Sequence, residues 1–237
     1  GYTPPAIKLS SDVMTPEVLW SFGRIGNVSV SPDGSKAVYD ITYFNKEEDR
    51  GYSDLYLMNL PEGQTTRLTD TDYNESDAGW TPDGKFITYL AKGQLWEMNP
   101  DGSNPRQVTD IPDGINGYVY APDMSKIVYL KDVQLEPTVQ DLYPDLPKAK
   151  ARIVDDQFYR HWNDWVDAYT HLFIADYVPA QPITTGKDIM EGERWESPVR
   201  PWGGVEQLAW TKDGKKLIYT CRKKIGIDYA ESTNTDL

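Results

Sequence analysis

The sequence has few of the residues that form disulfides, metal sites and imidazole-based catalytic sites. It contains one cysteine, Cys221, and two histidines in 237 residues. A single cysteine excludes an internal disulfide and any zinc site built from several thiolates. This cysteine usage fits a reducing compartment, and it also fits a bacterial periplasm, where many proteins lack disulfides.

Basic residues are outnumbered, and long hydrophobic runs are missing. The 37 acidic and 24 basic residues leave a formal net charge of −13. This charge argues against a nucleic-acid-binding protein, which needs a basic face to neutralise phosphates, and it disfavours docking on an anionic membrane. No apolar run approaches the roughly 18 residues of a membrane-spanning helix. No signal peptide is visible either.

The short motifs of several enzyme classes are also missing. The sequence has no Gly-x-Ser-x-Gly nucleophile elbow. It has no Gly-x-x-x-x-Gly-Lys-Ser/Thr phosphate loop and no Gly-x-Gly-x-x-Gly fingerprint. We therefore predict that this chain carries no catalytic residue, and that it binds neither a cofactor nor a metal ion.

An internal repeat is the strongest positive signal in the sequence. Four segments align without gaps: Val28–Tyr39, Ala78–Tyr89, Tyr118–Tyr129 and Leu208–Tyr219. Each has an aspartate at one position and a tyrosine six residues later. The aspartates are Asp33, Asp83, Asp123 and Asp213, and the tyrosines are Tyr39, Tyr89, Tyr129 and Tyr219. Glycine follows the aspartate in three copies, and Met124 replaces it in the third.

The chemistry of this repeat predicts a β-hairpin. Proline presets φ in a turn, aspartate bonds back to the local backbone, and glycine tolerates positive φ. Apolar residues alternate on both sides of the first turn, at Val28, Val30, Ala37 and Tyr39, as in strands. Because Met124 lacks the freedom of glycine, we expect a strained or different third turn. Since the aspartates recur at one structural position, we interpret them as turn residues and not as catalytic groups.

A second repeated hairpin completes a four-stranded unit. Leu55–Asp70 matches Leu95–Asp110 at a constant offset of 40 residues, and four strands in about 40 residues is the period of a propeller blade. We predict an all-β fold, a partial β-propeller of four-stranded antiparallel blades. The predicted blades cover residues 25–70, 76–110, 115–190 and 204–237, the first three complete and the fourth truncated.

The third blade contains a long insertion, residues 132–169, rich in proline, aspartate and aromatic residues. Its middle, Ala149–Trp165, is expected to hold a short helix. The sequence ends within the fourth blade, so we expect a fragment of a longer protein. Open blade edges are templates for association, and we therefore expect oligomerisation or disorder near the C-terminus.

The end of this insertion holds the candidate binding residues. Long loops in compact domains are often functional, and arginine and tryptophan are common binding anchors. The candidate substrate-binding residues are Arg160, His161, Trp162, Asp164 and Trp165. In the alternative interpretation, these aromatic residues pin the insertion onto the propeller and Arg160 pairs with an acidic neighbour. A metal site formed by His161 and His171 with Asp164 or Asp167 matches no recognised ligand spacing.

The repeats and three further stretches carry a family resemblance. The repeats read SPDGSKAVY, TPDGKFITY and TKDGKKLIYT, and the further stretches are Met14–Gly26, Tyr159–Trp165 with His171–Phe173, and Arg222–Ala230. Nearly the whole chain resembles the propeller portion of the prolyl oligopeptidase family of serine peptidases. The resemblance is closer to its bacterial dipeptidyl-peptidase and acylaminoacyl-peptidase members.

The resemblance implies a propeller of about seven blades that caps an α/β-hydrolase domain located later in the sequence. That domain carries the Ser-Asp-His triad and is absent from this chain. The implied function is to gate a serine exopeptidase that releases short peptides or blocked residues from oligopeptide N-termini. The implied partners are oligopeptides and the hydrolase domain, and the implied location is the periplasm or the exterior. No match is found for the glutamate pair that grips the substrate amine in some relatives.

Two other functions stay open at the level of the sequence. Non-enzymatic, protein-binding propellers of the TolB type have similar repeats, although the insertion and the Arg222–Ala230 stretch favour the peptidase. The interpretation as a carbohydrate-binding propeller is supported only by the abundant aromatic residues.

Overall fold

The computed structural model describes residues 1–155 and 160–237, which form two compact units. Unit 1 contains residues 1–114 and 178–184, and unit 2 contains residues 115–177 and 185–237. Each unit contains two consecutive copies of the repeat. No helix in the described part of the chain is both long enough and apolar enough to cross a membrane.

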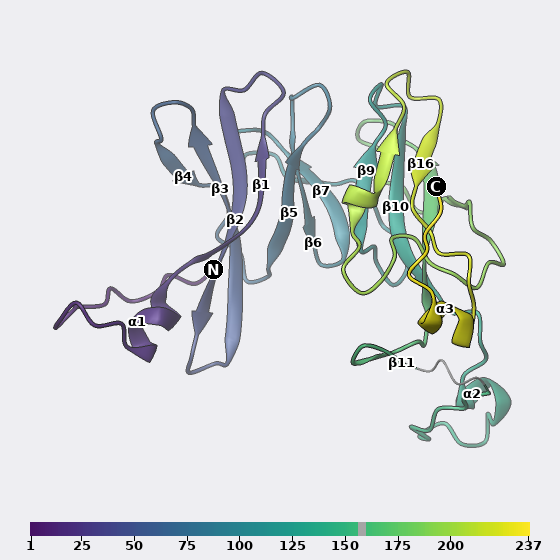
Figure 1. Ribbon diagram of the computed structural model, residues 1–237. Helices are drawn as coiled ribbons and strands as arrows, with labels where there is room; N and C mark the ends of the chain where they lie inside the picture. The colour runs from purple at the N-terminus through teal and green to yellow at the C-terminus, as the bar shows by residue number, and fades with distance from the viewer. Residues whose placement is uncertain (156–159) are drawn as a thin grey trace. The chain divides into compact units, whose positions relative to one another are not determined.

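Unit 1 consists of two antiparallel four-stranded sheets in which each strand pairs with the next one along the chain (Figure 1). Sheet 1 contains β1 (Arg24–Val30), β2 (Lys36–Asn45), β3 (Arg50–Asn59) and β4 (Thr65–Arg67). Sheet 2 contains β5 (Glu75–Trp80), β6 (Ile87–Ala91), β7 (Gln94–Met98) and β8 (Arg106–Gln107). The short helix α1 (Pro16–Ser21) precedes them and is capped by the Thr15 side chain.

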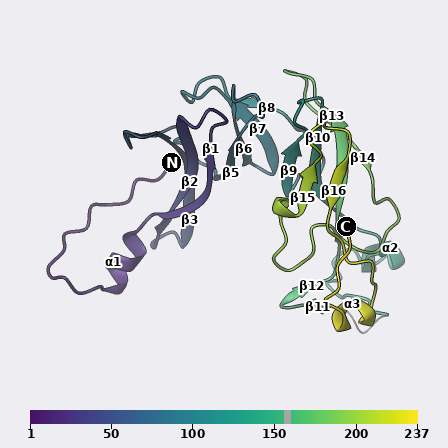
Figure 2. The same cartoon turned by 45° about the horizontal axis from the view of Figure 1, so that its top comes forward.

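Unit 2 contains a third four-stranded sheet and two two-stranded sheets, one of them within the insertion (Figure 2). Sheet 3 contains β9 (Gly117–Tyr120), β10 (Lys126–Val133), β13 (Tyr169–Asp176) and β14 (Lys187–Asp188), and sheet 4 contains β15 (Leu208–Trp210) and β16 (Leu217–Tyr219). The 3₁₀ turn η1 (Val205–Gln207) precedes β15, and α3 (Ile227–Glu231) follows β16. The predicted all-β fold with four-stranded antiparallel sheets is confirmed.

The repeated turns use the chemistry expected from their sequence. Ser31 Oγ and the Ser35 amide both donate to Asp33, at 2.6 and 3.0 Å. Thr81 and Thr211 donate in the same way to Asp83 and Asp213. The aspartates therefore stabilise the turns that join the first two strands of each sheet.

Met124 takes the same backbone conformation as the glycines that it replaces. Its φ is 57°, against 73° at Gly34, and both amides donate to the carbonyl three residues earlier at 2.8 Å. The expectation of a different third turn was therefore wrong. The backbone of Met124 is in the left-handed conformation that favours glycine, so the expected strain is present.

The matched threonines of the second hairpins also have matching roles. The Thr69 hydroxyl accepts from the Leu55 amide at 2.9 Å, and the Thr109 hydroxyl accepts from the Leu95 amide at 2.8 Å. Each threonine thus replaces a backbone partner at the point where the short fourth strand ends. This explains why the threonine recurs at an offset of 40 residues.

Each unit has one sheet-on-sheet core. In unit 1, Val38 and Leu55 of sheet 1 pack against Ile87 and Tyr89 of sheet 2. In unit 2, sheet 3 and sheet 4 are packed in the same way, through Val128, Leu130, Leu172, Leu208 and Trp210. The repeat tyrosines of the first three copies are buried within these units.

The insertion lies between two paired strands, because β10 pairs with β13 over the whole of residues 126–133 and 169–176. Its regular elements are α2 (Val139–Leu142), capped by Thr138, and a hairpin of β11 (Arg160–His161) and β12 (Asp164–Trp165). The helix expected over Ala149–Trp165 is wrong for the described part of that range, because residues 149–155 are irregular and residues 160–165 form the hairpin. Residues 156–159 lie outside the described residues.

Candidate functional site

The candidate binding residues form the β11–β12 hairpin. Arg160 pairs with Trp165 and His161 pairs with Asp164. Directly opposed residues of a hairpin share a face, so the hairpin has an Arg160–Trp165 face and a His161–Asp164 face. Trp162 stands at the tip with a positive φ of 59°.

The Arg160–Trp165 face interacts within the insertion. The Arg160 guanidinium donates to the Asn163 carbonyl at 3.0 Å and lies 5.0 Å from the centroid of the Trp165 ring. The Arg152 guanidinium lies 4.7 Å from the same ring and forms an ion pair with Asp167. These cation–π contacts hold the hairpin against residues upstream of it.

The opposite face meets α3 (Figures 1 and 2). The half-buried His161 ring lies edge-on to Tyr229, with 5.4 Å between the ring centroids. Burial lowers the pKa of His161, and the nearby Arg222 and Arg200 lower it further. The ring is therefore held in its neutral form more strongly than a free histidine. Asp164, its neighbour on this face, is exposed.

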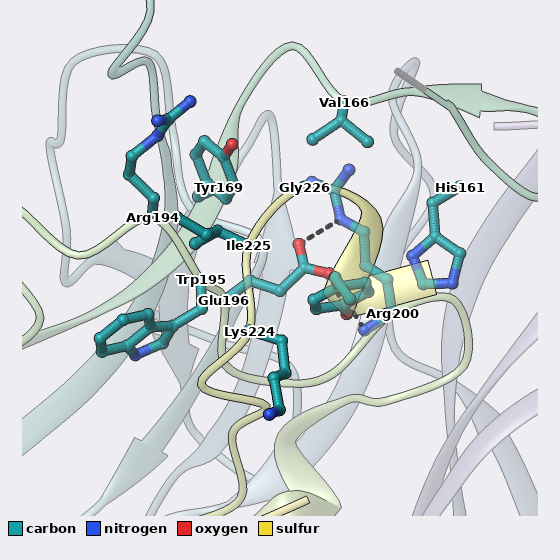
Figure 3. Close-up of a pocket in the computed structure, with 11 residues that line it drawn as sticks. His161, Val166, Tyr169, Arg194, Trp195, Glu196, Arg200, Lys224, Ile225 and Gly226 are labelled. Carbon is teal, nitrogen blue, oxygen red and sulfur yellow. Dashed lines mark hydrogen bonds and ion pairs between the residues drawn. The ribbon is translucent and has the colours of Figure 1, made fainter. Parts of the chain in front are cut away.

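Behind the hairpin lies a small cavity centred on Glu196. Its lining includes His161, Tyr169, Arg200, Lys224 and Tyr229. Figure 3 shows the Glu196 carboxylate pointing toward the Arg200 side chain. The Arg200 Nε lies 3.0 Å from one carboxylate oxygen, and the Tyr229 hydroxyl donates to the other at 2.9 Å.

Burial raises the pKa of Glu196, while Arg200 and the Tyr229 hydroxyl act against that rise. Burial also raises the pKa of Tyr229. The cavity has a volume of about 20 Å³, which admits a single water-sized group. The cavity is therefore too small to hold a peptide. His161, Glu196, Arg200 and Tyr229, here called the Glu196 cluster, join the hairpin to α3.

A larger groove opens along the insertion itself. Its volume is about 650 Å³, and its walls include Leu142, Ile153, Val154 and Trp165. Ion pairs lie along it, between Arg152 and Asp167 and between Arg194 and Glu136. This volume and this mixture of apolar and charged walls are typical of small-ligand sites.

His171 does not join the hairpin residues. It is fully buried, with Nδ1 2.8 Å from Asp188 and Nε2 3.0 Å from the Glu193 carbonyl. Asp167 is engaged by Arg152. Within residues 1–155 and 160–237, no group of three or more His, Cys, Asp or Glu side chains is placed to hold a metal ion.

Sequence reasoning missed Glu196, Arg200 and Tyr229. Tyr229 lies in the Arg222–Ala230 stretch that carries the family resemblance, and Glu196 and Arg200 are four residues apart. Neither pattern predicts that the three side chains meet, because the contact joins residues 33 positions apart in the chain.

The comparisons with known proteins agree with this architecture. No protein-family model matches the chain. It is 39% identical over 231 residues to dipeptidyl-peptidase 5 of Porphyromonas endodontalis. The aligned region covers 96% of this chain and 33% of the relative. The chain is related to dipeptidyl-peptidase 5. The enzyme of that name from Porphyromonas gingivalis is 39% identical over 99% of this chain and 35% of its own length.

The chain thus spans about a third of the length of these curated relatives. Among solved structures, acylaminoacyl peptidase from Pyrococcus horikoshii is similar with a TM-score of 0.52 and 16% identity. The similarity covers 67% of this chain and 24% of that one. At this identity the match supports the fold alone. The predicted relation to the propeller portion of such peptidases is confirmed.

Proposed function

We propose that this chain is the propeller portion of a serine exopeptidase that removes dipeptides or blocked residues from the N-termini of oligopeptides. The 39% identity to dipeptidyl-peptidase 5 over nearly the whole chain carries the proposal. Because the match covers a third of those relatives, the activity is assigned to the whole protein and not to this part of it.

The chemistry of the described residues supports a non-catalytic role for this part. A serine nucleophile needs a histidine within hydrogen-bond reach and a third group that orients the histidine. His171 is oriented by Asp188, but its other nitrogen contacts a backbone carbonyl. His161 packs against Tyr229. Both ring nitrogens of His171 are thus engaged by groups other than a serine hydroxyl.

The proposed contribution of the propeller is gating. A ring of blades beside an active site admits short, flexible peptides and excludes folded proteins by size. The partners proposed on this basis are oligopeptide substrates and a hydrolase domain of the same protein. We propose a periplasmic or secreted location from the family resemblance, and fractionation of the host cell tests it directly.

A comparison of two purified proteins tests the proposed function. The full-length protein should cleave dipeptidyl chromogenic substrates and lose this activity after treatment with a serine-reactive phosphonate. Residues 1–237 alone should show no turnover above background. Turnover by the short protein contradicts the assignment of catalysis to another part. A full-length protein that cleaves no dipeptidyl substrate contradicts the peptidase proposal itself.

A further inference from the structure

Two exposed tryptophans stand together beside the candidate site. Trp162 is 75% exposed and Trp202 is 78% exposed, the two highest values among the eight tryptophans of the chain. Their ring centroids lie 6.0 Å apart at an interplanar angle of 66°. The two rings therefore form an open apolar corner at the surface of unit 2.

The backbone at Trp162 is unfavourable for a bulky residue. A two-residue hairpin loop with a positive φ at its first position is normally occupied there by glycine. Trp162 holds φ at 59°, a conformation that is a clear outlier for large side chains. Such strain persists where the surrounding structure imposes it, and it is concentrated in binding sites. The observation therefore points to a role for this side chain that is separate from stability.

Polar residues flank both tryptophans along the chain. His161 precedes Trp162, and Arg200 lies two residues before Trp202. Both side chains line the cavity that contains the Glu196 carboxylate. Binding sites combine apolar walls with a few converging polar groups. A peptide offers this same combination, because each apolar side chain is flanked by amide groups.

We propose that Trp162 and Trp202 form an aromatic clasp that receives an apolar side chain of the peptide substrate. This inference rests on the proposed function, and it deepens that function by naming a substrate feature and a second residue, Trp202. The clasp would favour peptides with a large apolar residue over otherwise identical peptides with a small polar one.

The test uses the full-length protein and a series of tetrapeptides in which phenylalanine or serine occupies each position in turn. At the position that meets the clasp, Trp162→Gly and Trp202→Ala should lower kcat/KM for the phenylalanine peptide about five- to ten-fold, a typical value for an aromatic contact. The serine peptide should change little. Trp162→Phe should keep most of the preference, and Trp20→Ala, an exposed tryptophan of unit 1, is the matched control.

Thermal unfolding separates binding from structure. Glycine relieves the positive φ, so Trp162→Gly should have the same or a higher Tm while it loses the preference. A lower Tm, or an equal loss for both peptides, assigns Trp162 a structural role and overturns the proposal. An unchanged preference in Trp162→Gly also overturns it. If a variant changes the oligomeric state but not the preference for the phenylalanine peptide, the corner is a contact between copies of the chain. This outcome also overturns the proposal.

A binding measurement distinguishes failure of the clasp from failure of the proposed function. Tryptophan fluorescence of the full-length protein is titrated with the same tetrapeptides. If the wild type cleaves none of them but binds the phenylalanine peptide more tightly than Trp162→Gly does, the peptidase proposal is wrong and the clasp stands. If neither binding nor cleavage depends on Trp162, the clasp is wrong.

Discussion

Individual turn residues in this chain combine side-chain hydrogen bonds with an uncommon backbone conformation. The hydrogen bond from Ser31 and those from Ser35 lower the pKa of Asp33 to about 2. The carboxylate therefore stays charged, and accepts these bonds, over the whole physiological range. Met124 occupies the turn position that glycine occupies in the other three repeats. It is therefore the clearest position for a stability test.

Met124→Gly should stabilise unit 2 by about 1 kcal/mol, because glycine removes the cost of holding a side chain at positive φ. The matched change is Gly34→Ala, where an added Cβ meets nothing within 4 Å. It should destabilise unit 1 through the backbone alone. Urea unfolding measures both effects, and a loss of stability in Met124→Gly contradicts this explanation.

Buried carboxylates give a second test at the residue scale. Glu75 is buried between the hydroxyls of Thr69 and Thr71, and burial raises its pKa from the ordinary value of 4.5 although both hydroxyls act to lower it. In the pH window above 4.5, the folded chain therefore binds more protons than the unfolded chain. The free energy of unfolding should fall as the pH rises through this window.

Glu75→Gln should remove that pH dependence. Relative to the wild type, the variant should gain stability between pH 5 and pH 8. Urea unfolding at the two pH values measures the difference. Glu62→Gln, at an exposed turn, is the control. Equal slopes in the wild type and Glu75→Gln would show that another group sets the pH dependence.

At the scale of elements, the Glu196 cluster links residues 196–200, the β11–β12 hairpin and α3, which have little regular structure of their own. The β11–β12 hairpin has two residues in each strand, and α3 has five residues. Segments this short are marginal in water without tertiary contacts. Their stability therefore depends on the contacts among His161, Glu196, Arg200 and Tyr229.

Tyr229→Phe should destabilise unit 2 by about 1–2 kcal/mol, because it removes a hydrogen bond to a buried charged group. Hydrogen exchange should become faster in residues 160–165 and 227–231 and stay unchanged in β10. Tyr143→Phe, at a half-exposed tyrosine of the insertion, should have no effect. Unchanged exchange in the hairpin would mean that Trp165 and its arginine neighbours alone hold it in place.

The elements that the sequence predicts well are those that local rules define. The aspartate-containing turns and alternating strands specify each hairpin within about twelve residues, and all four hairpins formed, the third with Met124 in the turn conformation of the glycines. The insertion has no such periodicity, and its helix was expected in the wrong place. The true helix had a local signal, since Thr138 and Asp141 form a capping box. The Glu196 cluster had none, because it depends on contacts between distant residues.

At the scale of the whole molecule, the edge strand β1 of sheet 1 exposes apolar side chains. Ile25, Val28 and Val30 are more than half exposed. Their β2 neighbours Tyr39 and Ala37, which lie opposite Val28 and Val30, are buried. The equivalent face of sheet 2, with Trp80 and Tyr89, packs against sheet 1. An exposed apolar strand at the edge of a sheet favours association with another sheet.

Residues 1–237 expressed alone should therefore self-associate in a concentration-dependent manner. The double variant Val28→Lys and Val30→Lys should shift the protein toward the monomer, because charge on the face opposes packing. Size-exclusion chromatography with light scattering measures the shift. Val13→Lys, at an exposed residue of the N-terminal segment, should not change the distribution. A wild-type chain that is monomeric at all concentrations contradicts this expectation.

The outer edge of sheet 2 has a consequence for synthesis on the ribosome. The Ile183 amide donates to the Val108 carbonyl, and the Asp110 amide donates to the Ile183 carbonyl, each at 2.8 Å. Segment 178–184 therefore completes unit 1 although all of residues 115–177 is translated in between. The edge of sheet 2 in unit 1 therefore stays unpaired while much of unit 2 leaves the ribosome. A translational pause within residues 115–177 would prolong this vulnerable stage, in which chaperones have access to the edge.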